Sequence, residues 1–94
     1  MMDELIKLLK KRGIYNTFNV ISLFQNFRVD KHSFYMKLNE FSHYNSFIRV
    51  KDELIEKGLL NVILNNGACY FELTHKGQRM LYLLKELDKL LKKN

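Results

Sequence analysis

The sequence predicts a mostly helical α+β fold in which a two-stranded β-hairpin stands between helices. Apolar residues recur at helical spacing through 44–58, and Gly58 ends that segment. Apolar and polar residues then alternate on both sides of Asn66-Gly67, the strongest short signal of a hairpin. A leucine-rich helical pattern follows over 75–92. A helix that ends in glycine and leads into such a hairpin is typical of the second half of a winged helix-turn-helix unit.

The chain of 94 residues is long enough for one hydrophobic core, so we expect a single winged-helix domain over 1–94. Gly13 is expected to end a first helix. Arg28-Val29 is expected to form either an extended link or a short strand contact to the hairpin. The expected elements are an N-terminal helix (2–12), a core helix (17–27), a helix-turn-helix (31–41 and 44–58), a wing hairpin (60–74) and a long C-terminal dimerisation helix (75–92).

Short polar side chains stand where the expected helices begin. Asp30 and Thr74 can each accept a hydrogen bond from the first free amides of the helix that follows. Asn45 or Ser46 can do the same for the central helix. Gly58 can adopt the left-handed conformation that ends a helix without a steric penalty. These local signals predict the element boundaries.

Composition narrows the class of protein. Hydrophobic residues make up 47% of the chain and aromatic residues 13%, which excludes a disordered chain. No apolar run approaches twenty residues and no signal-peptide pattern is present, so no membrane partner is expected. A single cysteine offers no disulfide framework, and a cytoplasmic, reducing location is expected. Cys69 is expected to fill space on the inward face of a strand, with a disulfide between subunits as the alternative.

The net charge of +6 favours a polyanionic partner, but the excess is unevenly placed. Residues 75–94 carry six basic and two acidic side chains, which gives +4, and residues 1–12 carry four against two, which gives +2. The helix over 44–58 balances three bases against three acids. Most of the positive charge therefore lies on the terminal helices.

The sequence favours neither catalysis nor a metal site. The three histidines have no metal-ligand spacing with the single cysteine, and the residues at the start of the 31–41 helix cannot form a catalytic triad. No phosphate-binding or dinucleotide-binding glycine pattern occurs. We expect no enzyme activity, no cofactor and no small-molecule effector. The side chains excluded as metal ligands are His32, His43, His75 and Cys69. Those excluded as a catalytic triad are Asp30, His32 and Ser33.

Two stretches carry a resemblance to a known family. VKDELIEKGLL resembles the end of the reading helix in winged-helix regulators of the MarR and PadR type, and FELTHKG is similar to the segment where their second wing strand enters the last helix. The order of elements resembles that of the small members found in archaea and their viruses. The resemblance implies a double-stranded DNA-binding transcriptional regulator.

The resemblance also implies which residues meet DNA. The N-terminal half of the 44–58 helix would lie in the major groove, where Arg49 could bond guanine, Asn45 adenine and Ile48 a thymine methyl. Arg49 could instead be a solvated charge paired with Glu53, and Ile48 could pack on a neighbouring helix. The wing tip has no Arg or Lys, so its contact would be limited to asparagines. The expected DNA-binding set is Lys31, His32, Lys37, Tyr44, Asn45, Ser46, Ile48, Arg49, Asn65 and Asn66.

The leucine stripe of the last helix is wider than one small core requires. Four of its residues fall at four-three-four spacing, which suits a coiled-coil partner. The expected function is therefore a homodimeric, sequence-specific regulator. The alternatives are a protein-interaction module and a non-specific architectural DNA-binding protein. The expected dimer residues are Leu5, Leu9, Met80, Leu83, Leu84, Leu87 and Leu91.

Overall fold

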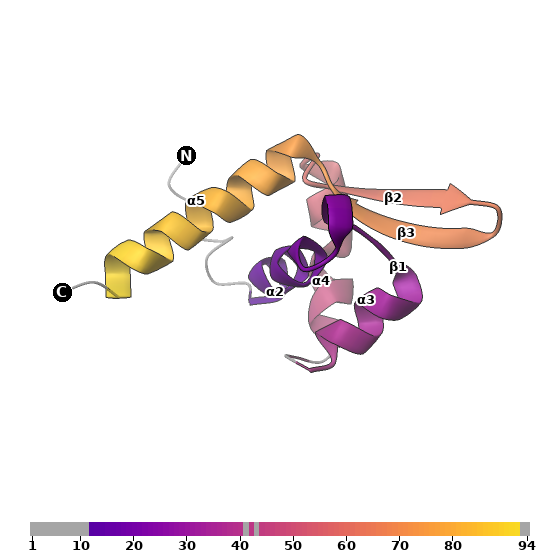
Figure 1. Ribbon diagram of the computed structural model, residues 1–94, viewed down its shortest axis with the longest axis horizontal. Helices are drawn as coiled ribbons and strands as arrows, with labels where there is room; N and C mark the ends of the chain where they lie inside the picture. The colour runs from indigo at the N-terminus through magenta and orange to yellow at the C-terminus, as the bar shows by residue number, and fades with distance from the viewer. Residues whose placement is uncertain (1–11, 41, 43, 93–94) are drawn as a thin grey trace.

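The computed structural model describes residues 12–40, 42 and 44–92 (Figure 1). The helix expected over 2–12 lies outside these residues except for Arg12, which belongs to the first described helix. The described elements are α2 (Arg12–Ser22), a 3-10 turn η1 (Gln25–Phe27), β1 (Arg28–Asp30), α3 (Lys31–Leu38), α4 (Tyr44–Glu56), β2 (Leu60–Asn65), β3 (Ala68–Leu73) and α5 (His75–Lys92).

The three strands form one antiparallel sheet in the order β1-β3-β2. Arg28-Val29, left open as a link or a strand contact, is part of β1 and pairs with β3. Asn66 and Gly67 have φ angles of 50° and 80°, as a two-residue type I′ turn requires. The hairpin prediction is therefore confirmed, and its wing consists of β2 and β3.

The core helix differs from the prediction. It begins at Arg12 instead of Thr17 and ends at Ser22 instead of Phe27. Gly13, expected to separate two helices, lies in its first turn, where a Cβ would overlap the carbonyl oxygen of Ser46 in α4. Beyond Ser22 the apolar spacing of the sequence continues, but Asn26 and Phe27 have positive φ angles, which turn the chain out of the helix into β1.

The remaining boundaries lie within a few residues of those expected. α3 ends at Leu38 and α4 at Glu56, three and two residues earlier than predicted, and the hairpin ends at Leu73. α5 has the same bounds as the expected C-terminal helix. The early end of α4 reflects its glycine stop, since residues 57 and 58 already form the turn.

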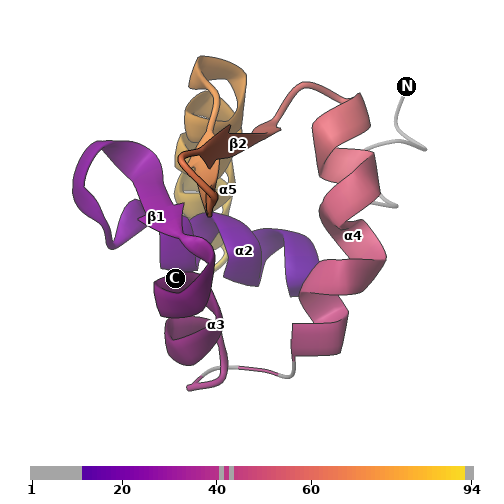
Figure 2. The ribbon, with the colours of Figure 1, turned by 90° about the vertical axis from the view of Figure 1, so that its right-hand side faces the viewer.

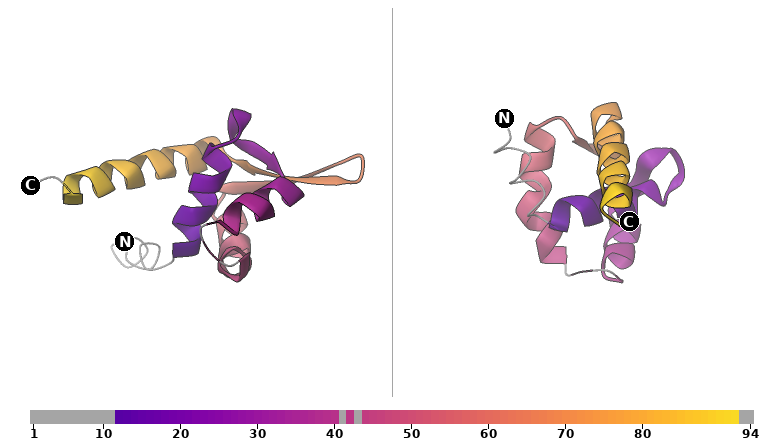
Figure 3. Two further views of the ribbon diagram at one scale, coloured as in Figure 1. Left: turned by 60° about the horizontal axis from the view of Figure 1, so that its bottom comes forward. Right: turned by 90° about the vertical axis from the view of Figure 1, so that its left-hand side faces the viewer.

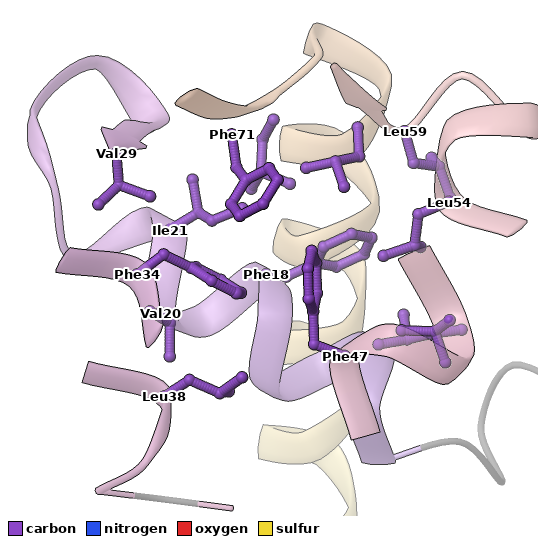
Figure 4. Packing of buried hydrophobic residues seen from close by; sticks show 14 of the residues in the cluster. Phe18, Val20, Ile21, Val29, Phe34, Leu38, Phe47, Leu54, Leu59 and Phe71 are labelled. Atoms are coloured by element: carbon purple, nitrogen blue, oxygen red, sulfur yellow. The ribbon is translucent and has the colours of Figure 1, made fainter. Parts of the chain in front are cut away.

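The core lies between the sheet and the helices α2, α3 and α4 (Figures 2 and 4). Phe34 of α3, Phe47 of α4 and Phe71 of β3 meet with ring centroids 4.6–5.0 Å apart. Phe18 of α2 is fully buried beside them. Such tilted and edge-to-face aromatic contacts stabilise a core beyond their buried area. One aromatic cluster thus joins every element that positions the helix-turn-helix.

The caps predicted at Asp30 and Thr74 are present, whereas α4 begins at Tyr44, so Asn45 and Ser46 lie inside its first turn and do not precede it. Asp30 accepts a hydrogen bond from the Ser33 amide at 3.0 Å, and Thr74 accepts one from the Gly77 amide at 3.0 Å. Gly58, with φ 73°, ends α4 in a Schellman motif, because the Leu59 amide donates to the Leu54 carbonyl at 2.9 Å and the Gly58 amide donates to Ile55. The sequence therefore fixes where α3, α4 and α5 begin or end.

Hydrogen bonds and close backbone packing connect the end of α4 to the start of α5. The Thr74 hydroxyl donates to the Gly58 carbonyl at 2.7 Å, and the Lys76 ammonium donates to the Lys57 carbonyl at 2.7 Å. Gly77 packs so closely on the backbone of Leu59 that a Cβ would overlap its carbonyl oxygen. We refer to these contacts of residues 57–59 with residues 74–77 as the α4–α5 joint.

Candidate nucleic-acid interface

One side of α4 is buried in the core, and in its first half the opposite side is exposed to solvent. Phe47 and Val50 are buried in the core, whereas Asn45, Ile48 and Arg49 are exposed, Ile48 to 45%. These three side chains follow i, i+3, i+4 spacing and therefore share one side of the helix. The structure thus brings together the central part of the predicted reading surface.

The start of α4 is packed against α2 and the turn after α3. Ser46 is half-buried, its hydroxyl lies 3.0 Å from that of Ser42, and its backbone carbonyl faces Gly13. The Ser42 amide in turn donates to the Leu38 carbonyl at the end of α3. Ser46 is thus part of the contact that sets the orientation of α4. The side chain of Tyr44 lies outside the described residues.

The first turn of α3 presents basic side chains next to the wing. Lys31 and His32 are exposed, and the Lys31 ammonium lies 5.8 Å from the centre of the Tyr35 ring. Hydrogen bonds from Ser33 lower the pKa of the Asp30 carboxyl below its ordinary value of 3.8, so this cap is ionised at neutral pH. Lys37, one helical turn further on, is half-buried and pairs with Glu40 at 3.1 Å.

The wing extends beyond the helices and is uncharged at its tip (Figure 1). Asn65 and Asn66 are exposed at the turn, as expected. Leu64 is 79% exposed and Val62 is 40% exposed. The sequence pattern does not distinguish either side chain as exposed, because period-two alternation assigns both to the inward face. The signal that could have found them is strand length, since the wing is longer than the core beneath it.

A surface hollow of about 530 Å³ separates the wing turn from the first turn of α3. Its walls include basic, acidic, aromatic and thiol side chains, together with the backbone of the turn. Cys69, expected to fill space on the inward face of a strand, is half-buried here. The lining residues are Asp30, Lys31, His32, Tyr35, Gly67, Ala68 and Cys69.

The predicted dimer stripe divides into two parts along α5. Met80 and Leu84 are partly buried against the core. Leu83, Leu87 and Leu91 are exposed, Leu87 to 42% and Leu91 to 86%. The second half of α5 runs away from the other described elements (Figures 1 and 3). Tyr82 and Leu90 add to the open surface, and Leu5 and Leu9 lie outside the described residues.

Within residues 12–40, 42 and 44–92, no group of three or more His, Cys, Asp or Glu side chains is placed to hold a metal ion. None of the helices in that part of the chain is long and apolar enough to cross a membrane.

Known structures share this architecture. F93 from STIV, a winged-helix DNA-binding protein, superposes with a TM-score of 0.69 over 84% of this chain and 89% of that chain, at 19% sequence identity. Sso10a-2, a DNA-binding protein from Sulfolobus solfataricus, gives 0.64 over 82% and 78%, at 18% identity. The sequence matches no family model and no curated protein. At such low identity the likeness shows the fold alone. The chain has the winged-helix fold, α+β and mostly helical, with the β2–β3 hairpin as its wing.

Proposed function

We propose that this protein is a homodimeric, sequence-specific double-stranded DNA-binding protein that acts inside the cell as a transcriptional regulator. The observation that carries the proposal is the side of α4 formed by Asn45, Ile48 and Arg49, which is exposed on a helix whose opposite side is locked into the core. The likeness to F93 and Sso10a-2, both DNA-binding proteins, supports it. The motifs VKDELIEKGLL and FELTHKG support the narrower assignment to small MarR- or PadR-like regulators of archaea or their viruses.

The exposed side of α4 has the chemistry needed to read bases. The major groove, about 12 Å wide, admits an α-helix, and each base pair presents its own pattern of donors and acceptors there. Arg49 can donate two hydrogen bonds to guanine and Asn45 can bond adenine, while Ile48 can contact a thymine methyl. Tyr44 and Ser46 stand at the first turn of the same helix. We therefore assign base reading to the first half of α4.

We assign the phosphate contacts to α3 and the long-range attraction to the net charge of the protein. Lys31 and His32 are exposed in the first turn of α3, where their side chains can reach phosphates. Lys37 is less available, because Glu40 lies 3.1 Å from its ammonium. The net charge of +6 adds long-range attraction to DNA. Phosphate contacts fix the position of a protein on the duplex, so α3 would hold α4 in register.

The dimer is assigned to α5. Exposed leucines on its second half form an apolar surface of a kind that monomers seldom leave open. A two-fold axis through this helix would present two copies of α4 to one duplex, with half-sites about 34 Å apart. Leu83, Leu87 and Leu91 are its assigned contacts, with Leu5 and Leu9 as further predicted members.

The test is selection of bound DNA from a random duplex pool, together with the mass of the protein by light scattering. A regulator of this type enriches a palindromic sequence that survives competition from excess random DNA. A pool that remains random after selection would exclude sequence-specific reading by α4.

A second candidate is a non-specific architectural DNA-binding protein. The observation that favours it is charge: α5 carries five exposed basic side chains, whereas α4 carries two basic and three acidic ones. Such a protein would bind any duplex and would lose affinity steeply with salt and with random competitor. A protein-interaction module, the remaining alternative, would bind no duplex at moderate salt. The five basic residues are Lys76, Arg79, Lys85, Lys89 and Lys92.

A further inference from the structure

The tip of the wing presents a leucine to solvent on the side of the sheet that faces the helices. Strand register pairs Leu64 with Cys69 and Val62 with Phe71, so all four side chains share one face of the hairpin. Phe71 is buried in the core, but the hairpin continues past the helices (Figure 1). Leu64, next to the turn, is 79% exposed. Leu64 therefore projects to the same side of the sheet as α3 and α4.

The chemistry of the hairpin is unsuited to holding phosphates. Residues 58–73 contain Glu72 as their one charged side chain and have no Lys, Arg or His. At the tip, two exposed amide side chains, Asn65 and Asn66, stand next to Leu64. Amides can bond the adenine N3 and thymine O2 acceptors of the minor groove. Leucine is among the side chains that minor-groove proteins insert between base steps.

A lysine and a histidine lie beside the tip instead of on it, next to the Asp30 carboxylate. Lys31 and His32 of α3 line the hollow of about 530 Å³ whose other wall is the wing turn at Gly67 and Cys69. A DNA strand that passed this hollow would meet the Lys31 ammonium with its phosphates while the neutral tip reached past the backbone. For insertion into the minor groove, the side chain that meets the phosphates and the apolar side chain that enters the groove must lie at different places on the surface, as they do here.

We propose that the wing enters the minor groove and that Leu64 acts as an apolar wedge between two base pairs, kinking the duplex, while Asn65 and Asn66 contact A·T base edges. This inference rests on the proposed DNA binding and names what the wing does within it. TA steps, which kink and unstack easily, would be favoured at this position. A kink from a wedge opens the minor groove and bends DNA by about 20–90° towards the major groove.

The minor groove suits this surface better than a protein partner does. A stable protein interface buries about 800 Å² on each partner, with a fully desolvated apolar centre. The tip offers two exposed apolar side chains, Leu64 and Val62, flanked by amides. A narrow wedge with polar neighbours matches a base step in size and chemistry.

Circularisation of short DNA by ligase tests the wedge without knowledge of an operator. A linear A·T-rich duplex of about 120 bp is shorter than the persistence length of about 150 bp, so its ends seldom meet unless a protein bends it. Wild-type protein is expected to raise the yield of circles. Leu64→Ala should bring the yield down to that of protein-free DNA while still binding the same duplex in a fluorescence anisotropy titration. Leu64→Met, which keeps an apolar wedge, should restore the circles.

Leu23→Ala is the matched control, because Leu23 is another exposed leucine, 55% accessible, that lies in the turn after α2. It should circularise DNA as the wild type does. Circles formed equally well by Leu64→Ala, or binding by the wild type with no rise in circles, would overturn the wedge and leave DNA binding intact. Failure of the wild type to bind any duplex would overturn both. A fall in the light-scattering mass of Leu64→Ala would reassign the tip to contact between protein copies and would also overturn the wedge.

Discussion

α4 and α5 are both amphipathic helices, but the domain covers their apolar sides to different extents. On α4, Phe47, Val50 and Leu54 are all at most 3% exposed. On α5, Leu81 is buried near the start, whereas Leu91 near the end is 86% exposed. A helix whose apolar side is fully covered takes its orientation from the domain. A helix whose apolar side extends beyond the core can pack against a partner outside the domain and orient it.

The largest effect is expected where the covered side of α4 is truncated. Phe47→Ala should lower the free energy of unfolding by about 3–5 kcal/mol, because a buried aromatic ring is lost and a cavity is left in the aromatic cluster. Tyr82→Ala, an aromatic truncation at a position of α5 that is 62% exposed, should change it by no more than about 0.5 kcal/mol. Urea denaturation of the two variants measures the difference. Equal losses would contradict the contrast between the helices.

Adding charge to the exposed apolar side of α5 tests whether that side forms the dimer contact. Leu87→Lys combined with Leu91→Lys should reduce the mass in solution from that of a dimer to the 11.3 kDa of one chain, without loss of helix by circular dichroism. Affinity for a selected full-length site should fall by about a hundredfold or more, because the two half-sites are no longer bound by linked copies. Leu23→Lys serves as a control for an added lysine outside α5. A wild-type mass of 11.3 kDa at micromolar concentration would rule out the dimer.

A comparison of two arginine variants tests whether α4 contacts bases. Arg49→Ala should cost about 1–3 kcal/mol of specific binding and relax the preference at one base position in each half-site. Arg79→Ala, which removes the same charge from α5, should weaken all sequences alike. Binding to a panel of single-base variants of the selected site separates the two results. An unchanged site preference in Arg49→Ala would remove that residue from the reading surface.

The caps that precede α3 and α5 differ in their response to acid. Asp30→Ala and Thr74→Ala should each cost about 0.5–2 kcal/mol of stability at neutral pH. The pKa of Asp30 is lowered in the folded protein, so its contribution is complete above the ordinary value of 3.8 and is lost as the pH falls through the lower folded value. The gap between wild type and Asp30→Ala should therefore close below about pH 4, whereas the gap for Thr74→Ala should persist. Urea denaturation between pH 7 and pH 2.5 checks this, and a constant Asp30 gap would contradict it.

The smallest effect is expected at the phosphate contacts. Lys31→Ala should weaken binding to every sequence and reduce the slope of log affinity against log salt by up to about one unit. Lys37→Ala should do less, since Glu40 already lies 3.1 Å from its ammonium. A titration of affinity against salt for both variants decides the order. A loss confined to certain sequences would point to base contact instead.

Features set by neighbouring residues could be predicted from the sequence. The Asn66-Gly67 turn, the Gly58 stop and the caps at Asp30 and Thr74 follow from local backbone chemistry, and each is present. The exposed side of α4 follows from helical spacing in the same way.

Features set by distant contacts could not be predicted. The start of α2 depends on the close approach of Gly13 to Ser46, thirty-three positions away in the chain (46 − 13). A lone glycine in the sequence looks like a helix end, whereas here it permits two helices to cross. How the α5 stripe divides between core and solvent depends on where the other elements stop, which no periodicity records. The exposure of Leu64 has the same origin, because alternation gives its face but not the extent of the core.

The α4–α5 joint has a mechanical consequence. α5 contains 18 residues, and its far end lies about 22 Å beyond Gly77, so a rotation of about 10° at Gly77 would move that end by roughly 4 Å. In a dimer built on α5, that displacement would appear as a change in the distance between the two copies of α4. The absence of one methyl group at residue 77 would then help to determine how many base pairs separate the half-sites.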